Sequence, residues 1–360
     1  LPVTRKHELL ARQQERRANH PDEGPFGGFS AIGWGAARRV FQSPGTIYEP
    51  EGGRRDYWRV ARALFAAGLR AGDLAHNSFS YHLTPAGSMM ETGAHALGCT
   101  VFPGGVGNTE LQLQAMAELK PQAYVGTPSF LKILLDKAAE LGQPLSVVKA
   151  LVSGEAFPPS LRDWLAVRGV AAYQCYATAD IGLIAYETAA REGLVLDEGV
   201  IVEIVRPGTG DPLPDGEVGE LVVTTLNPDY PLIRFGTGDL SAVLPGRCPT
   251  GRSNTRIKGW MGRADQSAKV RGMFVHASQV AEIARRFPVV GRARLVVEGE
   301  MANDRMTLKL ELAGAAPEGL AEQVAVAIRD VTKLRGAVQL LAAGSLPNDG
   351  RVIEDARKYD

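Results

Sequence analysis

The chain has 360 residues, 45% of them hydrophobic, which is enough for two or three domains with substantial cores. Its 40 basic and 40 acidic residues cancel, so charge gives no argument for binding nucleic acid or an anionic membrane. No apolar run approaches the roughly 20 residues that span a bilayer. Because Cys99, Cys175 and Cys248 form no C-x-x-C pair, we expect no disulfide framework, no structural zinc and a cytoplasmic protein.

The first segment, "LPVTRKHELLARQQERR", is neither a signal peptide nor a start at Met. We therefore expect a fragment whose N-terminal part is missing. Further along, "QSPGTIYEP" (residues 42–50) has the rhythm of a phosphate-binding loop without its usual lysine. Ser43, Gly45 and Thr46 supply small residues and hydroxyls, whereas Glu49 brings a negative charge. A plain turn between two strands is an equally good interpretation.

The next hundred residues alternate helical and strand-like segments. The spacing of apolar residues predicts a helix over 56–69, then helix, strand and Gly-rich loop over 91–105, and strand, turn and helix over both 121–142 and 147–169. Such units predict a parallel sheet that binds ligands beyond the carboxyl ends of its strands. The loops at Gly126, Gly154 and Tyr176 should lie at that edge.

The pattern changes at Gly199. Two β-branched runs around a Pro/Gly/Asp turn predict a small antiparallel β-subdomain at about 199–260. A hairpin within 292–314 and a helix over 318–334 follow. We expect an α/β protein with a large domain, residues 1–264, and a small α+β domain, residues 265–360.

Four segments carry a family resemblance. They are "SGEAFP" (153–158), "CYATADIG" (175–182), "LIRFGTGDL" (232–240) and "GRADQSAKVRG" (262–272). In this order they resemble the adenylate-forming (acyl-CoA synthetase) superfamily, and most of all its phenylacetate–CoA ligase branch. The resemblance implies a large domain of parallel sheets flanked by helices, and a small mobile C-terminal domain.

The chemistry of that family implies the substrates. A carboxylic acid attacks the α-phosphate of ATP, pyrophosphate leaves, and the thiol of coenzyme A displaces AMP from the acyl-adenylate. The resemblance therefore implies a small-molecule carboxylic acid, ATP, Mg²⁺ and coenzyme A as a co-substrate, with no nucleic acid or membrane as partner. A homodimer is compatible with it.

The resemblance assigns the nucleotide to five residues. Asp239 in "TGD" would accept hydrogen bonds from both ribose hydroxyls, and Arg263 would add a ribose or phosphate contact. Tyr176 would stack on adenine, beside the loop that contains Gly154 and Glu155. The alternatives are a turn aspartate, a surface arginine and a core tyrosine.

The phosphate and metal contacts depart from the family. Asp180 stands where the family has the Glu that binds Mg²⁺; otherwise it would be a helix N-cap. The stretch "SPGTIYEP" keeps Ser43, Gly45 and Thr46 but loses the lysine. Glu49 would repel pyrophosphate unless it faces solvent or meets Arg38, Arg39, Arg54 or Arg55.

Three residues of the small domain are assigned to catalysis and movement. Arg351 stands where the family has a catalytic lysine, with Lys358 seven residues on. Arginine is planar and always charged, so the exchange is not conservative. An exposed tail arginine is an equally good interpretation. Asp265 would be the hinge between an adenylation and a thioester-forming arrangement.

The acid pocket is the least specific part. Phe79, Tyr81 and His82 would form one wall, with His82 as a gate, and Tyr124 and Gly126 would line the other. His82 could equally be a structural residue in a helix. Aromatic walls and small residues suit an aryl or arylacetic acid.

Two other functions remain open. The changes at Glu49, Ala179 and Arg351 also fit an AMP- or acyl-adenylate-binding protein that has lost efficient catalysis. Adenylation without transfer to coenzyme A is the third possibility. Acid-dependent pyrophosphate exchange separates the second from the others, and coenzyme A-dependent release of AMP separates the first from the third.

Overall fold

The computed structural model describes all residues except 44–45, 265, 300–302, 315, 348–350 and 358–360. The chain divides into two compact units, residues 1–262 and 263–359.

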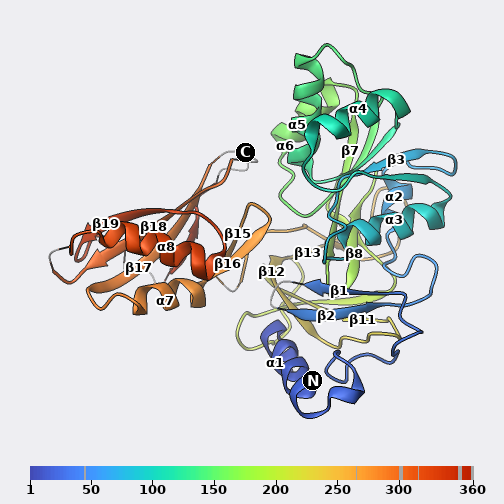
Figure 1. Cartoon of the computed structure of the whole chain (residues 1–360). Coiled ribbons are helices and arrows are strands. Elements are labelled where there is room, and N and C mark those ends of the chain that lie inside the picture. The colour runs from blue at the N-terminus through green and yellow to red at the C-terminus, as the bar shows by residue number, and fades with distance from the viewer. Residues whose placement is uncertain (44–45, 265, 300–302, 315, 348–350, 358–360) are drawn as a thin grey trace. The chain divides into compact units, whose positions relative to one another are not determined.

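A nine-stranded mixed sheet is the frame of the first unit, with strands in the order β13-β14-β9-β8-β7-β6-β5-β3-β4 (Figure 1). The parallel strands are β3 (Leu74–Asn77), β4 (Thr100–Pro103), β5 (Ala123–Gly126), β6 (Lys149–Val152) and β7 (Ala171–Thr178). The antiparallel strands are β8 (Gly182–Glu187), β9 (Leu194–Leu196), β13 (Val243–Leu244) and β14 (Arg256–Ile257). The predicted parallel sheet is therefore confirmed, and its direction changes at β7.

Helices connect the parallel strands of this sheet. They are α3 (Ala86–Leu97), α4 (Thr109–Leu119), α5 (Pro128–Glu140) and α6 (Pro159–Val167), and α2 (Ala61–Ala66) precedes the first of these strands. Both α5 and α6 begin at a proline, whose missing N–H costs nothing in the first turn of a helix. Crossover connections of this kind bury the helices' apolar faces and bring the strand ends together at one edge.

The helix predicted over 56–69 is shorter than expected. The structure begins α2 at Ala61 because Asp56 and Arg59 both have positive φ, 55° and 64°. The Asp56 carboxylate accepts from the backbone N–H groups of Val60 and Ala61. Arg59 turns inward and donates to Asp197 and to two backbone carbonyls. Periodicity alone does not reveal these inward-facing polar contacts.

Smaller elements complete the first unit. They are α1 (Lys6–Asn19), a 3₁₀ turn (Pro21–Glu23), the hairpin β1 (Arg39–Ser43) and β2 (Ile47–Glu51), and the antiparallel sheet β10 (Val200–Val205), β11 (Gly219–Thr225) and β12 (Phe235–Ser241). The last of these confirms the antiparallel pairing predicted within 200–226. Buried Leu9 of α1 and Phe235 of β12 share one hydrophobic cluster.

The second unit is an α+β fold with its own core. A sheet in the order β19-β18-β17-β20 consists of β17 (Val290–Glu298), β18 (Arg305–Leu312), β19 (Ala337–Ala342) and β20 (Ile353–Asp355). The other elements are β15 (Ser267–Val270), β16 (Met273–His276), α7 (Ala277–Arg285) and α8 (Leu320–Thr332). The predicted hairpin is confirmed, since β17 and β18 pair antiparallel.

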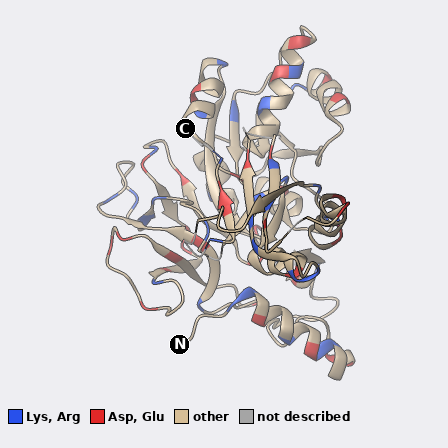
Figure 2. Cartoon of the chain, turned by 90° about the vertical axis from the view of Figure 1, so that its left-hand side faces the viewer, with Lys and Arg blue, Asp and Glu red and all other residues tan. Residues whose placement is uncertain are grey.

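Charge is evenly mixed over both units. Figure 2 shows basic and acidic residues interspersed along the helices and strands, as the equal numbers of each sign lead one to expect. Among the described residues, no helix is long and apolar enough to cross a membrane.

Candidate active site

The carboxyl ends of β5, β6 and β7 hold the predicted adenine loop. Gly126 ends β5, and its carbonyl accepts from the Ser153 N–H at 3.2 Å. The Ser153 hydroxyl donates to the carbonyl of Cys175 in β7 at 2.7 Å. Glu155 accepts from the Ser129 N–H at 2.7 Å and so satisfies a free donor in the first turn of α5. Gly154 and Glu155 are exposed at this edge.

Tyr176 and Asp239, predicted to hold the adenine and the ribose, contact each other. The Tyr176 hydroxyl donates to Asp239 Oδ2 at 2.6 Å, across 63 residues of sequence. The Asp239 N–H donates to the Thr237 hydroxyl at 3.1 Å, which shapes the "TGD" turn inside β12. Both side chains are partly exposed. A carboxylate beside an aromatic ring is thus available at the edge of the sheet.

Trp260 completes this arrangement, although no sequence pattern singled it out. Its indole Nε1 donates to Asp239 Oδ1 at 3.1 Å. Each Asp239 oxygen therefore accepts from an uncharged aromatic donor. The signal that could have found Trp260 is its place in "GWMGR", just before the segment resembling the family hinge.

The stretch resembling a phosphate loop is the turn of the β1–β2 hairpin. Ser43 pairs with Ile47 across the hairpin, and Thr46 has a φ of 62°. Gly45 lies outside the described residues. The Gln13 side chain of α1 donates to the Tyr48 carbonyl and accepts from the Tyr48 N–H, both at 2.8 Å. The N-terminal helix therefore fixes this hairpin.

Glu49 lies in neither position that the sequence analysis allowed. Its side chain is fully buried, and it accepts from the Ser43 hydroxyl at 3.1 Å instead of facing solvent or an arginine. Burial, and then the nearby Asp180 carboxylate, raise the pKa of Glu49 well above its ordinary value, while Lys6 opposes this shift. Alternation along β2 is the reason, because Ile47 and Glu49 lie on the same buried face of the strand.

Asp180 lies in the turn between β7 and β8, so it is not a helix N-cap. It is buried, and the Lys6 ammonium from α1 lies 3.0 Å from Oδ1 and 3.1 Å from Oδ2. The sequence gives no signal for this pair, because 174 residues separate its members. The pair places one positive charge beside two carboxylates, Asp180 and Glu49.

The chemistry of Asp180 fits a hard cation. Its Oδ1 is buried and accepts no hydrogen bond from the described residues, although Lys6 lies close to it. A carboxylate oxygen with spare lone pairs is the ligand that Mg²⁺ prefers. Among the described residues no cluster of three or more His, Cys, Asp or Glu could hold a metal without other ligands. Water and phosphate oxygens would have to complete the coordination.

The predicted acid pocket has one rigid wall and one exposed turn. Phe79 is buried, whereas Tyr81 and His82 are exposed in a turn between β3 and α3, so His82 is not in a helix. Asn77 holds this turn by donating to the Tyr81 hydroxyl at 2.8 Å and to the Gly87 carbonyl at 2.9 Å.

On the other side, Tyr124 is fully buried in β5 and donates to the Thr127 carbonyl at 3.1 Å. A Cβ at Gly126 would lie 2.2 Å from the Tyr124 hydroxyl oxygen, so this position needs glycine. The two residues predicted to line the pocket together are therefore in contact.

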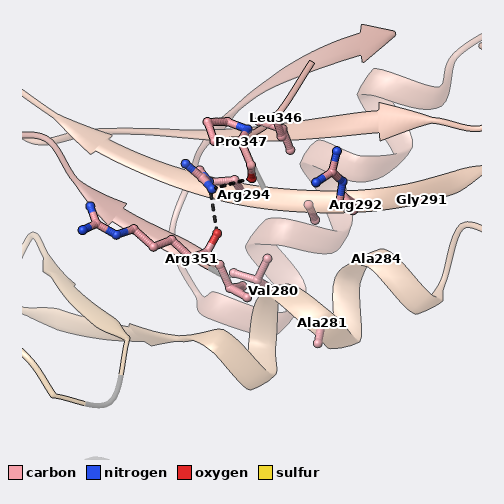
Figure 3. Close-up of a pocket in the computed structure, with 11 residues that line it drawn as sticks. Val280, Ala281, Ala284, Gly291, Arg292, Arg294, Leu346, Pro347 and Arg351 are labelled. Carbon is pink, nitrogen blue, oxygen red and sulfur yellow. Dashed lines mark hydrogen bonds between the residues drawn. The ribbon is translucent and has the colours of Figure 1, made fainter. Parts of the chain in front are cut away.

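In the second unit, Arg263 donates to the Ser267 hydroxyl at 2.9 Å, and its guanidinium lies 5.1 Å from the centre of the Phe274 ring. Arg351 is exposed, and it lines a cavity of about 350 Å³ between α7, the start of β17 and the tail (Figure 3). Buried Arg294 donates to the backbone carbonyls of Arg351 and Pro347, both at 3.1 Å. The predicted hinge Asp265 and the predicted tail lysine Lys358 lie outside the described residues.

Comparisons with known proteins show the family of the chain. Residues 78–227 match the family described as AMP-binding enzyme. The chain is 32% identical over 329 residues to a phenylacetate–coenzyme A ligase of Thermus thermophilus, covering 87% of this chain and 71% of the relative. It is 33% identical over 308 residues to the enzyme of the same name from Aromatoleum evansii, covering 81% and 69%.

A solved structure resembles the whole chain. It is a 2-hydroxyisobutyryl-CoA ligase in complex with its acyl-AMP and CoA in the thioesterification state. The likeness has a TM-score of 0.81 at 26% identity, and covers 99% of this chain and 80% of the other.

Proposed function

The chain belongs to the adenylate-forming, AMP-binding superfamily as a phenylacetate–CoA ligase-like, AMP-forming acid–CoA ligase, and on that premise we propose that its acid is an aryl or arylacetic acid. The observation that carries the site assignment is the hydrogen bond between Tyr176 and Asp239. It joins two family motifs at the edge of the parallel sheet, where α/β proteins bind ligands.

Nucleotide binding would fall to the groups at this edge. The ring of Tyr176 would stack on adenine beside Gly154 and Glu155, and the Asp239 carboxylate would accept from the ribose hydroxyls. Arg263 would add a contact to ribose or phosphate. In the β1–β2 turn, Ser43 and Thr46, with Gly45 between them, would face the pyrophosphate end through backbone amides and the Thr46 hydroxyl. The Ser43 hydroxyl is already engaged with Glu49.

A Mg²⁺ ion bound with the nucleotide would be held by Asp180. Such an ion neutralises phosphate charge and polarises the α-phosphate. Lys6 is the chain's own cation at this position, and it balances the Asp180 charge when no other cation is near. In the family, a lysine of the phosphate loop provides positive charge near the phosphates, and the β1–β2 hairpin of this chain lacks that lysine.

The acid would enter beside Phe79, Tyr81 and His82, with Tyr124 and Gly126 opposite. Its carboxylate oxygen attacks the α-phosphate, the bond to pyrophosphate breaks, and Arg351 would stabilise the charge that develops on both groups. The thiol of coenzyme A then attacks the acyl carbon, loses its proton, and expels AMP. We further propose that residues 265–360 form a small mobile domain with its hinge at Asp265, and that Lys358 assists in the tail.

The proposed substrate is supported by the pocket walls. The exposed side chains of Tyr81 and His82 and the close Gly126–Tyr124 contact favour a flat, short substrate over a long flexible chain.

Acid-dependent exchange of pyrophosphate into ATP tests the proposal across phenylacetate, benzoates, short hydroxy acids and fatty acids. We expect the fastest exchange with phenylacetate or a close analogue, and AMP release that requires coenzyme A. Asp239→Asn should reduce the exchange, whereas Asp136→Asn, at a surface pair on α5, should leave it unchanged. Faster exchange with fatty acids would refute the aryl assignment. AMP binding without any exchange would instead show that catalysis has been lost.

A further inference from the structure

The chain returns to β12 just before the first unit ends. The Lys258 N–H donates to the Ala242 carbonyl, and Leu240 exchanges backbone hydrogen bonds with Met261 and Gly262, all at 2.9 Å. The Ser241 hydroxyl adds a bond of 2.7 Å to the Gly259 carbonyl. Residues 258–262 are therefore fixed alongside the end of β12. Trp260 is held beside Asp239 by backbone pairing and not by chance contact of side chains.

The Asp239 carboxylate accepts a hydrogen bond at each of its two oxygens. Tyr176 donates to Oδ2 at 2.6 Å, and Trp260 donates to Oδ1 at 3.1 Å. The terminal torsion of an aspartate is broad, so one donor leaves the carboxylate plane poorly defined. Two donors on different oxygens fix that plane. A carboxylate has about four acceptor sites, so these two donors alone do not fill it.

We propose that Trp260 is a positioning residue for the ribose of the nucleotide. It orients the Asp239 carboxylate so that the remaining acceptor sites face the 2′- and 3′-hydroxyls together. This inference rests on the proposed nucleotide site. It adds a residue that lies outside the four segments carrying the family resemblance, shortly before the segment 262–272. Trp260 acts through Asp239 and is not itself a catalytic residue.

The physical setting favours orientation over packing as the role of this indole. Trp260 is 41% exposed, so it contributes less to the core than a buried tryptophan would. Its indole N–H can only donate a hydrogen bond, and an ionised carboxylate can only accept one, so the direction of this hydrogen bond is fixed. A donor that carries no charge orients the carboxylate without itself neutralising the negative charge.

The test compares Trp260→Phe with the wild-type protein, because phenylalanine keeps an aromatic ring and removes the N–H. The matched control is Trp34→Phe, at an exposed tryptophan of the same unit outside the site. Affinities are measured by calorimetry for AMP and for 2′,3′-dideoxy-AMP. We expect Trp260→Phe to bind AMP about tenfold more weakly, the size expected for a hydrogen bond to a charged group. Its affinity for the dideoxy nucleotide should change less than about twofold.

Turnover gives a second readout. The KM for ATP should rise in Trp260→Phe while the KM for the acid stays within about twofold of the wild-type value. Wild-type tryptophan emission should also change when AMP binds. The change should persist in Trp34→Phe and be lost in Trp260→Phe. This emission measurement in the wild-type protein tests the environment of the indole even if a variant fails to fold.

Two results would overturn the inference. Equal losses of affinity for AMP and for the dideoxy nucleotide would mean that the indole supports the fold and not the ribose. Unchanged AMP affinity would mean that Tyr176 alone orients Asp239. Binding is measured without turnover, so a wild-type protein that binds AMP but catalyses no exchange refutes the proposed function and still tests Trp260. A wild-type protein that binds no AMP overturns both.

Discussion

At the scale of single residues, two aspartates of the site have opposite environments. Asp239 is partly exposed and accepts hydrogen bonds from two uncharged aromatic donors. Asp180 is buried, and the Lys6 ammonium lies within 3.1 Å of both of its oxygens. A cation for Asp180 has to compete with Lys6.

Replacing Lys6 with methionine should destabilise the protein, because Asp180 and Glu49 would then share a buried region without a positive charge. The Lys6 side chain is 39% exposed, so water screens part of its interaction with the two carboxylates. We therefore expect the free energy of unfolding to decrease by about 1–2 kcal/mol, as measured by urea denaturation.

Lys132→Met is the matched control, because that lysine is exposed to a similar degree and pairs with Asp136 on the surface of α5. Its effect should stay below about 0.5 kcal/mol. Adding Glu49→Gln to Lys6→Met should recover part of the stability. Equal effects of the two lysine changes would contradict this role for Lys6.

Gly126→Ala should disturb both the stability of the protein and the proposed acid pocket, since the new Cβ would lie 2.2 Å from the Tyr124 hydroxyl oxygen. We expect a loss of about 1–3 kcal/mol, typical of an overfilled core, and a raised KM for the acid. Tyr124→Phe in the same chain should restore part of both. Gly33→Ala, where nothing lies within 4 Å of the added atom, should be neutral in thermal denaturation and kinetics.

Whether a site residue could be predicted from the sequence depends on how far along the chain its contacting residue lies. Asp239 and Tyr176 stand in short motifs, so residue type and spacing were enough to single them out. Lys6 and Trp260 act through partners 174 and 21 residues away, and only the folded sheet brings them together. Glu49 was misjudged for the same reason, because its burial depends on α1 and the hairpin packing together.

At the scale of elements, the parallel strands were predictable and one helix was not. Short apolar runs ending in glycine or proline marked β5, β6 and the helices after them. The start of α2 was wrong because Asp56 and Arg59 adopt backbone angles that apolar spacing does not encode. Local pattern therefore gave the order of elements, and buried polar contacts decided their ends.

One of these buried contacts attaches α6 to the sheet. Arg162 donates to both Glu187 oxygens, each at 2.9 Å, and to the Ala172 carbonyl at 3.2 Å. Arg162→Leu would leave Glu187, 4% exposed, without its cation, so we expect a loss of about 3 kcal/mol in urea denaturation. Adding Glu187→Gln should recover part of the loss. A double variant no more stable than Arg162→Leu alone would show that packing, and not charge, holds the helix.

At the scale of the whole molecule, the residues proposed for nucleotide binding and catalysis are divided between the two units. Tyr176, Asp239 and Trp260 lie in residues 1–262, whereas Arg263 and Arg351 lie in residues 263–359. Each unit also has a separate hydrophobic core. Binding of AMP and catalysis of adenylation should therefore be separable by truncation.

A chain ending at Gly262 should keep AMP binding within about tenfold of the full chain, because Arg263 contributes at most one charged hydrogen bond. It should lose acid-dependent pyrophosphate exchange, because it lacks Arg351, the residue proposed to stabilise the charge of that step. Calorimetric titration with AMP and an exchange assay on the same preparation measure the two. The full chain carrying Asp239→Ala is the control and should fail in both. Exchange at the full rate by the truncated chain would remove Arg351 from the mechanism.

The short strand β20 has a consequence for Arg351, which precedes it by two residues. Ile353, Glu354 and Asp355 pair with the middle of β17, and only Ile353 of the three is buried. Three ladder pairs at the edge of a sheet form one of the less stable parts of a fold. Each residue released from such a ladder adds about 3.3 Å to the length of free chain. Between Arg351 and this strand, the Val352 carbonyl accepts from the Leu295 N–H at 2.9 Å, so Arg351 gains reach only when this bond and the β20 ladder open together.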